Sequence, residues 1–156
     1  MKLSTNFTLE ELTASATAKV RGISNRPSLE VLGNLKRLAD ELEKVRHALG
    51  DKPLHIHSGY RSPNLNAAVG GSKSSYHMLG LAADFDPPSD MTHDEAQHIL
   101  ALLADLDYDL ILEEKAKDGA HWIHLQVSKE PGKGRRLVRD AELDRQGGSI
   151  TRTHAG

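Results

Sequence analysis

The feature that most constrains the fold is a single long amphipathic helix, predicted to begin after Ser28 and to end near Gly50. Ser28 suits the N-cap position, and Gly50 stands where the apolar pattern stops. Between them, apolar residues recur at steps of three and four along the chain: Leu32, Leu35, Leu38, Ala39, Leu42, Val45 and Leu49. A helix with such a stripe must bury it, so we expect this face to pack into the core.

Short strands are predicted downstream of this helix, at residues 54–57, 81–86, 110–113 and 122–128. A capping box at Thr92 and Glu95 opens a second helix, to about Leu103. A similar box at Thr8 and Glu11 opens a short N-terminal helix that runs to about residue 17. The segment 65–76 is rich in Gly, Ser and Asn, which predicts a loop with about one helical turn.

The chain length of 156 residues predicts one domain, large enough to bury a core, and no internal repeat is present. Beyond Pro131 the sequence becomes basic and loses its periodicity. We therefore place a single domain at residues 1–145 and expect residues 146–156 to form a frayed C-terminal tail.

The composition excludes several classes of function. The formal net charge is −2, which gives no overall electrostatic case for nucleic acid or for an anionic membrane surface. Aromatic residues make up 4% of the chain, too few for the stacking platforms that bind single-stranded nucleic acid. The N-terminus has no apolar run of the signal-peptide type, and no segment is apolar for long enough to span a bilayer. We therefore expect accumulation in the cytoplasm and no membrane insertion.

Three residues are candidate metal ligands. His77 and Asp84 stand seven positions apart, and Asp84 lies in a predicted strand. Alternation in the strand 122–128 puts His124 on a polar face, opposite an apolar face made by Ile123, Leu125 and Val127. Two such strands side by side would bring Asp84 and His124 together. One straight strand cannot present both His77 and Asp84, but Gly80 supplies a bend that brings His77 back.

Two imidazoles and one carboxylate form a ligand set of catalytic zinc, which keeps a fourth position open for water or substrate. A structural zinc site normally closes that position, commonly with cysteine, and this chain has no cysteine. Histidine and aspartate at such a spacing are also common without a metal, as hydrogen-bonded structural or surface residues. On the residues alone, both interpretations stay open.

Three motifs in order carry a resemblance to a known family. They are Ser58-Gly-Tyr-Arg-Ser62, the segment from Ser75 to Asp84, and Trp122-Ile-His124. Over roughly residues 54 to 128 the chain resembles the zinc D-alanyl-D-alanine carboxypeptidases and their peptidoglycan endopeptidase relatives, which share the hedgehog/DD-peptidase fold and include small phage endolysins. The resemblance implies an α+β fold, with a small, mainly antiparallel sheet flanked by helices and the site on its exposed face.

The resemblance also implies a role for individual residues. One zinc ion would be held by His77, Asp84 and His124. Arg61 would act on the substrate, by stabilising an oxyanion or by clamping a carboxylate, and Ser75 would hydrogen-bond the substrate. The plain alternatives are a salt bridge that orders the loop for Arg61 and ordinary turn chemistry for Ser75.

His121 occupies the family's position for the general base, where many relatives carry Glu or Asp and some carboxypeptidases carry His. An imidazole can accept and return a proton near neutral pH. His121 comes three residues before His124, so it must sit in a loop or a bulge to reach the metal. The alternative is an exposed loop histidine, and Glu113 or Glu114 is then the candidate for the base.

These roles predict a zinc metallopeptidase that hydrolyses a peptide bond in the stem peptides of peptidoglycan. The sequence leaves open whether it is a D-alanyl-D-alanine carboxypeptidase or an endopeptidase that cuts an L-alanyl-D-glutamate bond or a cross-link. A small chain without a signal peptide is typical of a phage or prophage lysis enzyme, acting at the wall as a monomer. The alternative is a non-catalytic, zinc-stabilised wall-binding module or virion structural module.

Overall fold

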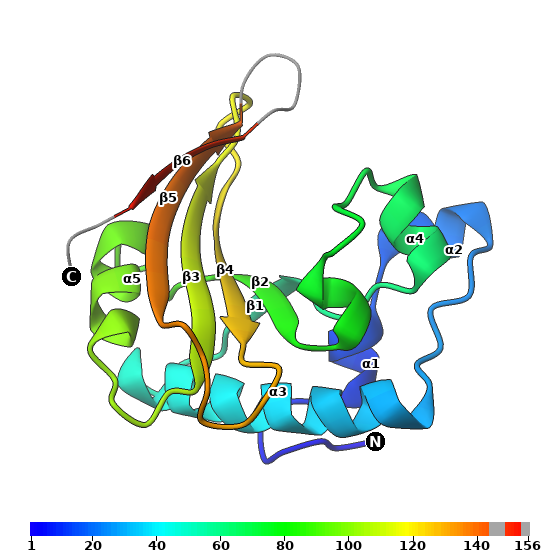
Figure 1. Ribbon diagram of the computed structural model, residues 1–156, viewed down its shortest axis with the longest axis horizontal. Helices are drawn as coiled ribbons and strands as arrows, with labels where there is room; N and C mark the ends of the chain where they lie inside the picture. The colour runs from blue at the N-terminus through cyan, green and yellow to red at the C-terminus, as the bar shows by residue number, and fades with distance from the viewer. Residues whose placement is uncertain (144–148, 154–156) are drawn as a thin grey trace.

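The computed structural model describes residues 1–143 and 149–153, and its architecture is α+β as expected. The helical elements are α1 (Leu9–Thr13), α2 (Ala16–Arg21), α3 (Leu29–Ala48), α4 (Pro63–Ala68), the 3₁₀ helix η1 (Tyr76–Leu79) and α5 (His93–Ala101). The strands are β1 (His55–Ser58), β2 (Ala82–Asp86), β3 (Tyr108–Lys115), β4 (His121–Val127), β5 (Leu137–Leu143) and β6 (Ser149–Thr153). In Figure 1, α3 runs along the bottom of the molecule, below the sheet. Helix α5 lies to the left of the sheet, and α1, α2 and α4 lie to its right. Within the described residues, none of the helices has the length and apolar character that a membrane crossing requires.

The described strands form one sheet, in the order β1-β2-β4-β3-β5-β6. Strands β3 and β5 run parallel and the other neighbours run antiparallel, so the prediction of a mainly antiparallel sheet is confirmed. Because β4 lies between β2 and β3, the two strands predicted to carry metal ligands are direct neighbours.

Helix α3 supplies much of the core, as predicted. Ser28 caps the helix by accepting a hydrogen bond from the backbone N–H of Val31 at 3.2 Å. The fully buried residues of α3 are Leu35, Leu38, Ala39, Leu42 and Val45. They form one apolar cluster with residues of α5 and with the odd-numbered face of β4, which carries Ile123, Leu125 and Val127. The even-numbered face of β4, with His124, therefore points away from this core.

The N-terminal segment forms two short helices where one was predicted. Thr8 caps α1 by accepting from the backbone N–H of Glu11, and Ser15 caps α2 by accepting from that of Ala18. Ala14 adopts an extended conformation between them, which ends α1. The second predicted capping box forms in full and opens α5. Residues 65–76, predicted as a loop with about one turn, contain the end of α4 and the start of η1.

Strand β5 lies in the basic segment where regular structure was not predicted. Its residues have no clear alternation, and the strand forms because its backbone pairs in parallel with β3, from Leu110 opposite Leu137 to Lys115 opposite Glu142. Of the predicted tail 146–156, the described part is β6, which pairs antiparallel with β5. The rest of that segment lies outside the described residues, and the domain boundary stays a prediction.

Candidate metal centre

His77 lies in η1, which folds back over the start of β2. Ser75 caps this turn, because its hydroxyl accepts a hydrogen bond from the backbone N–H of His77 at 3.2 Å. Gly80 ends the turn with a φ of 72°, a left-handed conformation that glycine adopts at little cost. The predicted bend at Gly80 is confirmed. Ser75 has the turn role, and its contact with substrate stays a prediction.

Elements η1, β2 and β4 bring three buried side chains together. Asp84 of β2 pairs directly opposite His124 of β4, as strand alternation predicted. His124 Nδ1 lies 2.7 Å from Asp84 Oδ1, and His77 Nε2 lies 3.3 Å from Asp84 Oδ2. Their candidate ligand atoms all lie within 4.8 Å of one another. The residues predicted to hold zinc therefore form one cluster.

The donor atoms of this cluster suit a cation. His77 Nδ1 lies 2.7 Å from the carbonyl oxygen of Gly59, so Nδ1 donates its proton there and Nε2 keeps its lone pair. Nε2 is buried and makes no hydrogen bond within the part of the chain that the structure describes. A buried polar atom without a partner is costly unless a ligand binds it. Two imidazole nitrogens and a carboxylate fit zinc, and a backbone carbonyl is a usual outer partner of a zinc-bound histidine.

The charges in the cluster are also those that a cation site requires. Burial alone would raise the pKa of Asp84, but the facing imidazoles of His77 and His124 hold this pKa well below its usual range. Burial lowers the pKa of His77, which favours its neutral, ligating form. Burial opposes protonation of His124 as well, but Asp84 and Gln126 outweigh it and raise the pKa of His124. Zinc binding at His124 would therefore displace a proton.

Arg61 reaches the cluster from the loop between β1 and α4. Its Nε donates to Ser58 Oγ at 3.2 Å, and its Nη1 donates to Asn66 Oδ1 at 3.1 Å. The other guanidinium nitrogen, Nη2, lies 3.8 Å from Asp84 Oδ2. Gly71 permits this packing, because a side chain there would collide with Asn66 and Arg61. Arg61 therefore orders its loop and also faces the candidate ligands, while its action on a substrate stays a prediction.

His121 lies on the opposite face of the sheet from His124. The prediction that it sits in a loop or a bulge is wrong, because β3 and β4 pair in an unbroken register along this stretch. Two residues separated by three positions in a regular strand point to opposite sides. His121 Nε2 instead lies 2.8 Å from Glu113 Oε1, and its ring stacks on His93 of α5 with 3.6 Å between centroids. Its Nε2 is therefore engaged by Glu113, and its role as general base stays a prediction.

Glu114 is an ionisable residue of β3 that lies on the ligand face. It pairs with Trp122 across β3 and β4, so its side chain lies on the same face as His124. Burial raises the pKa of Glu114 and the Asp84 carboxylate adds to this, while His124 and Arg61 act against it. A half-buried carboxyl group with a raised pKa, close to the ligands, is suited to accept a proton near neutral pH.

Two surface hollows adjoin the cluster and share His57. One, of about 370 Å³, runs past Arg61 between the α1–α2 linker and α4. The other, of about 450 Å³, is lined by Asp84 and Asp86 of β2 and by Ala120, His121 and Trp122 around the start of β4. His57 Nε2 lies 2.8 Å from Asp86 Oδ1, which holds the side chain between the hollows. One hollow therefore reaches the cluster at Asp84, and the other runs along Arg61 next to it.

Comparison with known protein families matches residues 5–125 to the model of peptidase M15. The chain belongs to the peptidase M15 family. The matched range contains the whole His77–Asp84–His124 cluster and Arg61, and it confirms the resemblance seen in the sequence. A segment of 44 residues is also 50% identical to the zinc D-Ala-D-Ala carboxypeptidase of Streptomyces albus G, over 28% of this chain. That segment covers 17% of the relative, so the chain matches only a small part of that protein's length.

In this chain of the M15 family, the candidate ligands could be predicted from the sequence, but the groups that orient them were missed. Gln126 lies two residues after His124, and alternation alone places both on one face, so a signal for Gln126 was present. His124 Nε2 lies 2.9 Å from Gln126 Oε1. Gly59 orients His77 through a backbone carbonyl, for which no residue type in the sequence is a signal.

On the helix side of the sheet, Glu113 belongs to a group of three carboxylates. Ligand oxygens of Asp94, Glu113 and Asp140 lie within 4.8 Å of one another. Burial raises the pKa of Glu113 to about 7, and its hydrogen bond with Asp94 and the charge of Asp140 add to this effect. A proton on Glu113 therefore relieves repulsion within the group at neutral pH and below.

We expect the variant Glu113→Gln to be more stable than the wild-type protein at high pH only. Because the folded state holds the Glu113 proton from the ordinary pKa of 4.5 up to about 7, the free energy of unfolding falls as pH rises through this window. A neutral glutamine removes that fall. The free energy of unfolding of the variant should therefore equal that of wild type near pH 5 and exceed it by at most about 3 kcal/mol near pH 8. Urea unfolding at both pH values measures the difference. If the variant and the wild-type protein differed in free energy of unfolding by the same amount at both pH values, the raised pKa of Glu113 would be contradicted.

Proposed function

We propose that this chain is a zinc-dependent peptidase that hydrolyses a peptide bond in the stem peptides of peptidoglycan. The observation that carries the proposal is the buried cluster of His77, Asp84 and His124, where His77 Nε2 has no hydrogen-bond partner among the described residues. Membership of the M15 family supports peptidase activity. The carboxypeptidase relative supports zinc as the metal and a D-alanyl stem peptide as the substrate class.

The residues divide the chemistry between them. His77, Asp84 and His124 would hold zinc, which when bound supplies a Lewis acid and a water molecule of lowered pKa. Arg61 would donate from Nη2 to the carbonyl oxygen of the scissile bond, since Nε and Nη1 already donate to Ser58 and Asn66. Glu114 would accept a proton from the attacking water and return it to the leaving amine.

The two hollows favour an internal peptide bond. A carboxypeptidase holds a single residue beyond the scissile bond, whereas an endopeptidase must accommodate chain on both sides. The hollow along Arg61 and the hollow over Asp86 offer space on two sides of the site. They support cleavage of an L-alanyl-D-glutamate bond or a cross-link. A D-alanyl-D-alanine carboxypeptidase is the second candidate, favoured by the named relative.

Bacterial wall lysis by a phage or prophage is the setting that we propose for this reaction. The resemblance of the three motifs to a family that includes small phage endolysins supports it. The partner would be the stem peptide of peptidoglycan, which the enzyme meets at the wall.

Digestion of purified sacculi tests the proposal. We expect the wild-type protein with zinc to release soluble fragments, and a chelator to abolish the release. Mass spectrometry of the products then identifies the bond, because a new amino terminus within the stem or cross-link indicates an endopeptidase. Free D-alanine as the sole product would instead establish the carboxypeptidase. No hydrolysis with zinc restored would support the non-catalytic wall-binding or virion module.

A further inference from the structure

We propose that Gln126, oriented by Asp109, keeps a proton on Nε2 of His124 and thereby makes Nδ1 the nitrogen that faces the metal. Neither residue is a candidate ligand, so both are positioning residues. The inference rests on the proposed zinc site, but one of its measurements needs no metal. A line of side chains from the cluster to the protein surface carries the argument.

Hydrogen bonds link each side chain of this line to the next. His124 Nε2 lies 2.9 Å from Gln126 Oε1, and Gln126 Nε2 donates to Asp109 Oδ2 at 3.3 Å. Arg135 completes it, donating from Nε to Asp109 Oδ1 at 2.9 Å and from Nη2 to Oδ2 at 2.7 Å. Asp109 is only 5% exposed, so water competes little for its oxygens.

A bulge in β3 places Asp109 in this line. Tyr108 pairs with Val127 and Leu110 pairs with Gln126, so Asp109 is an extra residue between two paired positions. In an unbroken strand Asp109 would point into the apolar core, opposite to Leu110. The bulge turns its carboxylate to the ligand face instead, which is how bulges beside functional sites redirect side chains.

The chemistry of donors and acceptors fixes the direction of each bond. An ionised Asp109 can only accept, so Gln126 must turn its NH₂ group toward it. The amide oxygen of Gln126 then faces His124 and can only accept, so Nε2 of His124 must carry a proton. Nδ1 of His124, which lies 2.7 Å from Asp84 Oδ1, is left as the nitrogen that exchanges its proton for a metal. His77 follows the same logic with the nitrogens reversed, since its Nδ1 is engaged by Gly59.

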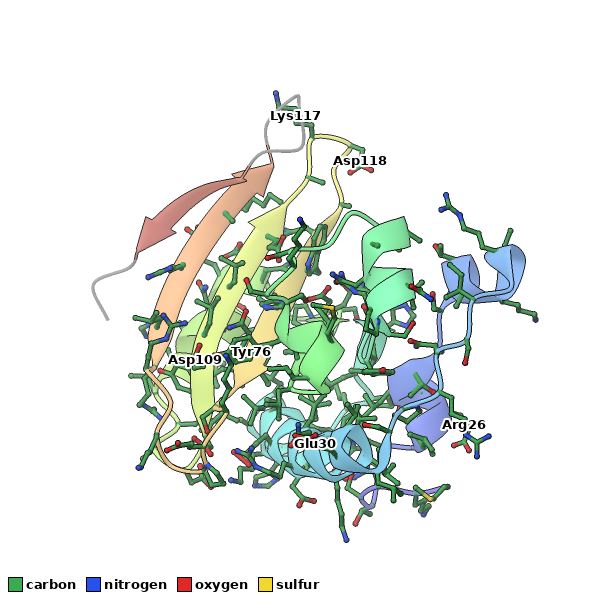
Figure 2. All side chains as sticks on the ribbon, turned by 45° about the vertical axis from the view of Figure 1, so that its right-hand side comes forward. Arg26, Glu30, Tyr76, Asp109, Lys117 and Asp118 are labelled. Carbon is green, nitrogen blue, oxygen red and sulfur yellow. The ribbon has the colours of Figure 1, made fainter. Side chains whose placement is uncertain are left out.

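Two further contacts keep Asp109 ionised and in place. Hydrogen bonds from Arg135 hold the pKa of Asp109 at about 2. The hydroxyl of Tyr76, the residue before His77, also hydrogen-bonds to Asp109. Figure 2 shows the labelled side chains of Tyr76 and Asp109 close together between η1 and β3. Asp109 therefore connects the elements that carry both histidine ligands.

Zinc affinity of the full chain, measured by competition with a chelator, tests the inference. Gln126→Leu keeps a side chain of similar size and removes the acceptor, so Nε2–H of His124 loses its partner. We expect the Kd for zinc to rise by about 10- to 100-fold. The double variant Asp109→Asn with Gln126→Glu reverses the bond between the two residues, with a donor at 109, and keeps an acceptor at 126 for His124. We expect it to bind zinc within about threefold of wild type.

Asp107→Asn is the matched control. Asp107 also accepts hydrogen bonds at this end of the sheet, from Gly132 N at 2.9 Å and from Arg37 Nη2 at 3.3 Å, but no hydrogen bond links it to the cluster among the described residues. We expect this variant to keep its zinc affinity. Equal losses in Asp107→Asn and Gln126→Leu would show a general structural effect and overturn the inference.

The second measurement is made without zinc. In ¹⁵N NMR spectra we expect a slowly exchanging Nε2–H signal of His124 in wild type and in the double variant, and its loss in Gln126→Leu. A folded Gln126→Leu protein that keeps this signal and its zinc affinity overturns the inference. If Gln126→Leu does not fold, loss of the signal in the double variant overturns it. If wild type shows the signal pattern but binds no zinc, the proposed function fails while the role of Gln126 stands.

Discussion

Asp84→Asn is expected to lose zinc and hydrolysis together. The Asp84 carboxylate is buried between two imidazoles, 2.7 Å from His124 Nδ1 and 3.3 Å from His77 Nε2. An asparagine of the same size brings no negative charge to neutralise a dication, and its NH₂ group has no lone pair to offer a metal. Metal catalysis contributes several kcal/mol to transition-state stabilisation, so kcat/KM should fall by about 1,000-fold or more. Metal analysis and kinetics on stem-peptide fragments measure the two losses.

Asp86→Asn is the control for this variant. Asp86 lies two residues further along β2, on the same face, and pairs with His57 at 2.8 Å rather than with the cluster. We expect it to keep its zinc. Zinc should also raise the unfolding temperature of wild type and Asp86→Asn but not that of Asp84→Asn, because only a ligand that binds the folded state stabilises it. An Asp84→Asn protein with one tightly bound zinc would contradict the assignment of the ligand set.

The candidate ligands could be predicted from the sequence because strand geometry constrains them. Alternation placed His124 on the polar face of its strand, and pairing with β2 put Asp84 opposite to it. The bend at Gly80 could be predicted from the odd separation of His77 and Asp84, which a straight strand cannot accommodate. Each of these inferences uses local geometry alone, and the fold then brings the segments together as the hydrophobic pattern requires.

The side of the sheet on which His121 lies could not be predicted in the same way, because it depends on register between strands. A motif position three residues before His124 pointed to His121, but an unbroken β3–β4 register turns that side chain to the helix side. The position of Asp109 depends on a bulge in β3, and no residue type in the sequence indicates that bulge. Strand β5 likewise forms through parallel pairing with a partner far along the chain. Such features come from long-range pairing and not from local patterns.

Glu114→Gln is expected to lower kcat by about 100- to 10,000-fold and to leave zinc binding intact, as removal of a general base does. Glutamine keeps the size and the oxygen of the side chain but cannot accept the proton of the attacking water. His121→Ala provides the control, since that imidazole contacts Glu113 and His93 on the other side of the sheet. We expect His121→Ala to retain activity within a few-fold. The opposite ranking of the two variants would return the base role to His121.

The pH profile gives an independent test of Glu114. Burial raises its pKa above the ordinary value, and a base acts only when deprotonated, so wild-type kcat/KM should rise with pH through this raised pKa. The residual activity of Glu114→Gln should lack this rise, while His121→Ala should keep it. Zinc content measured on the same samples separates loss of the base from loss of the metal. A Glu114→Gln enzyme that keeps the acidic limb of the profile would show that another group accepts the proton.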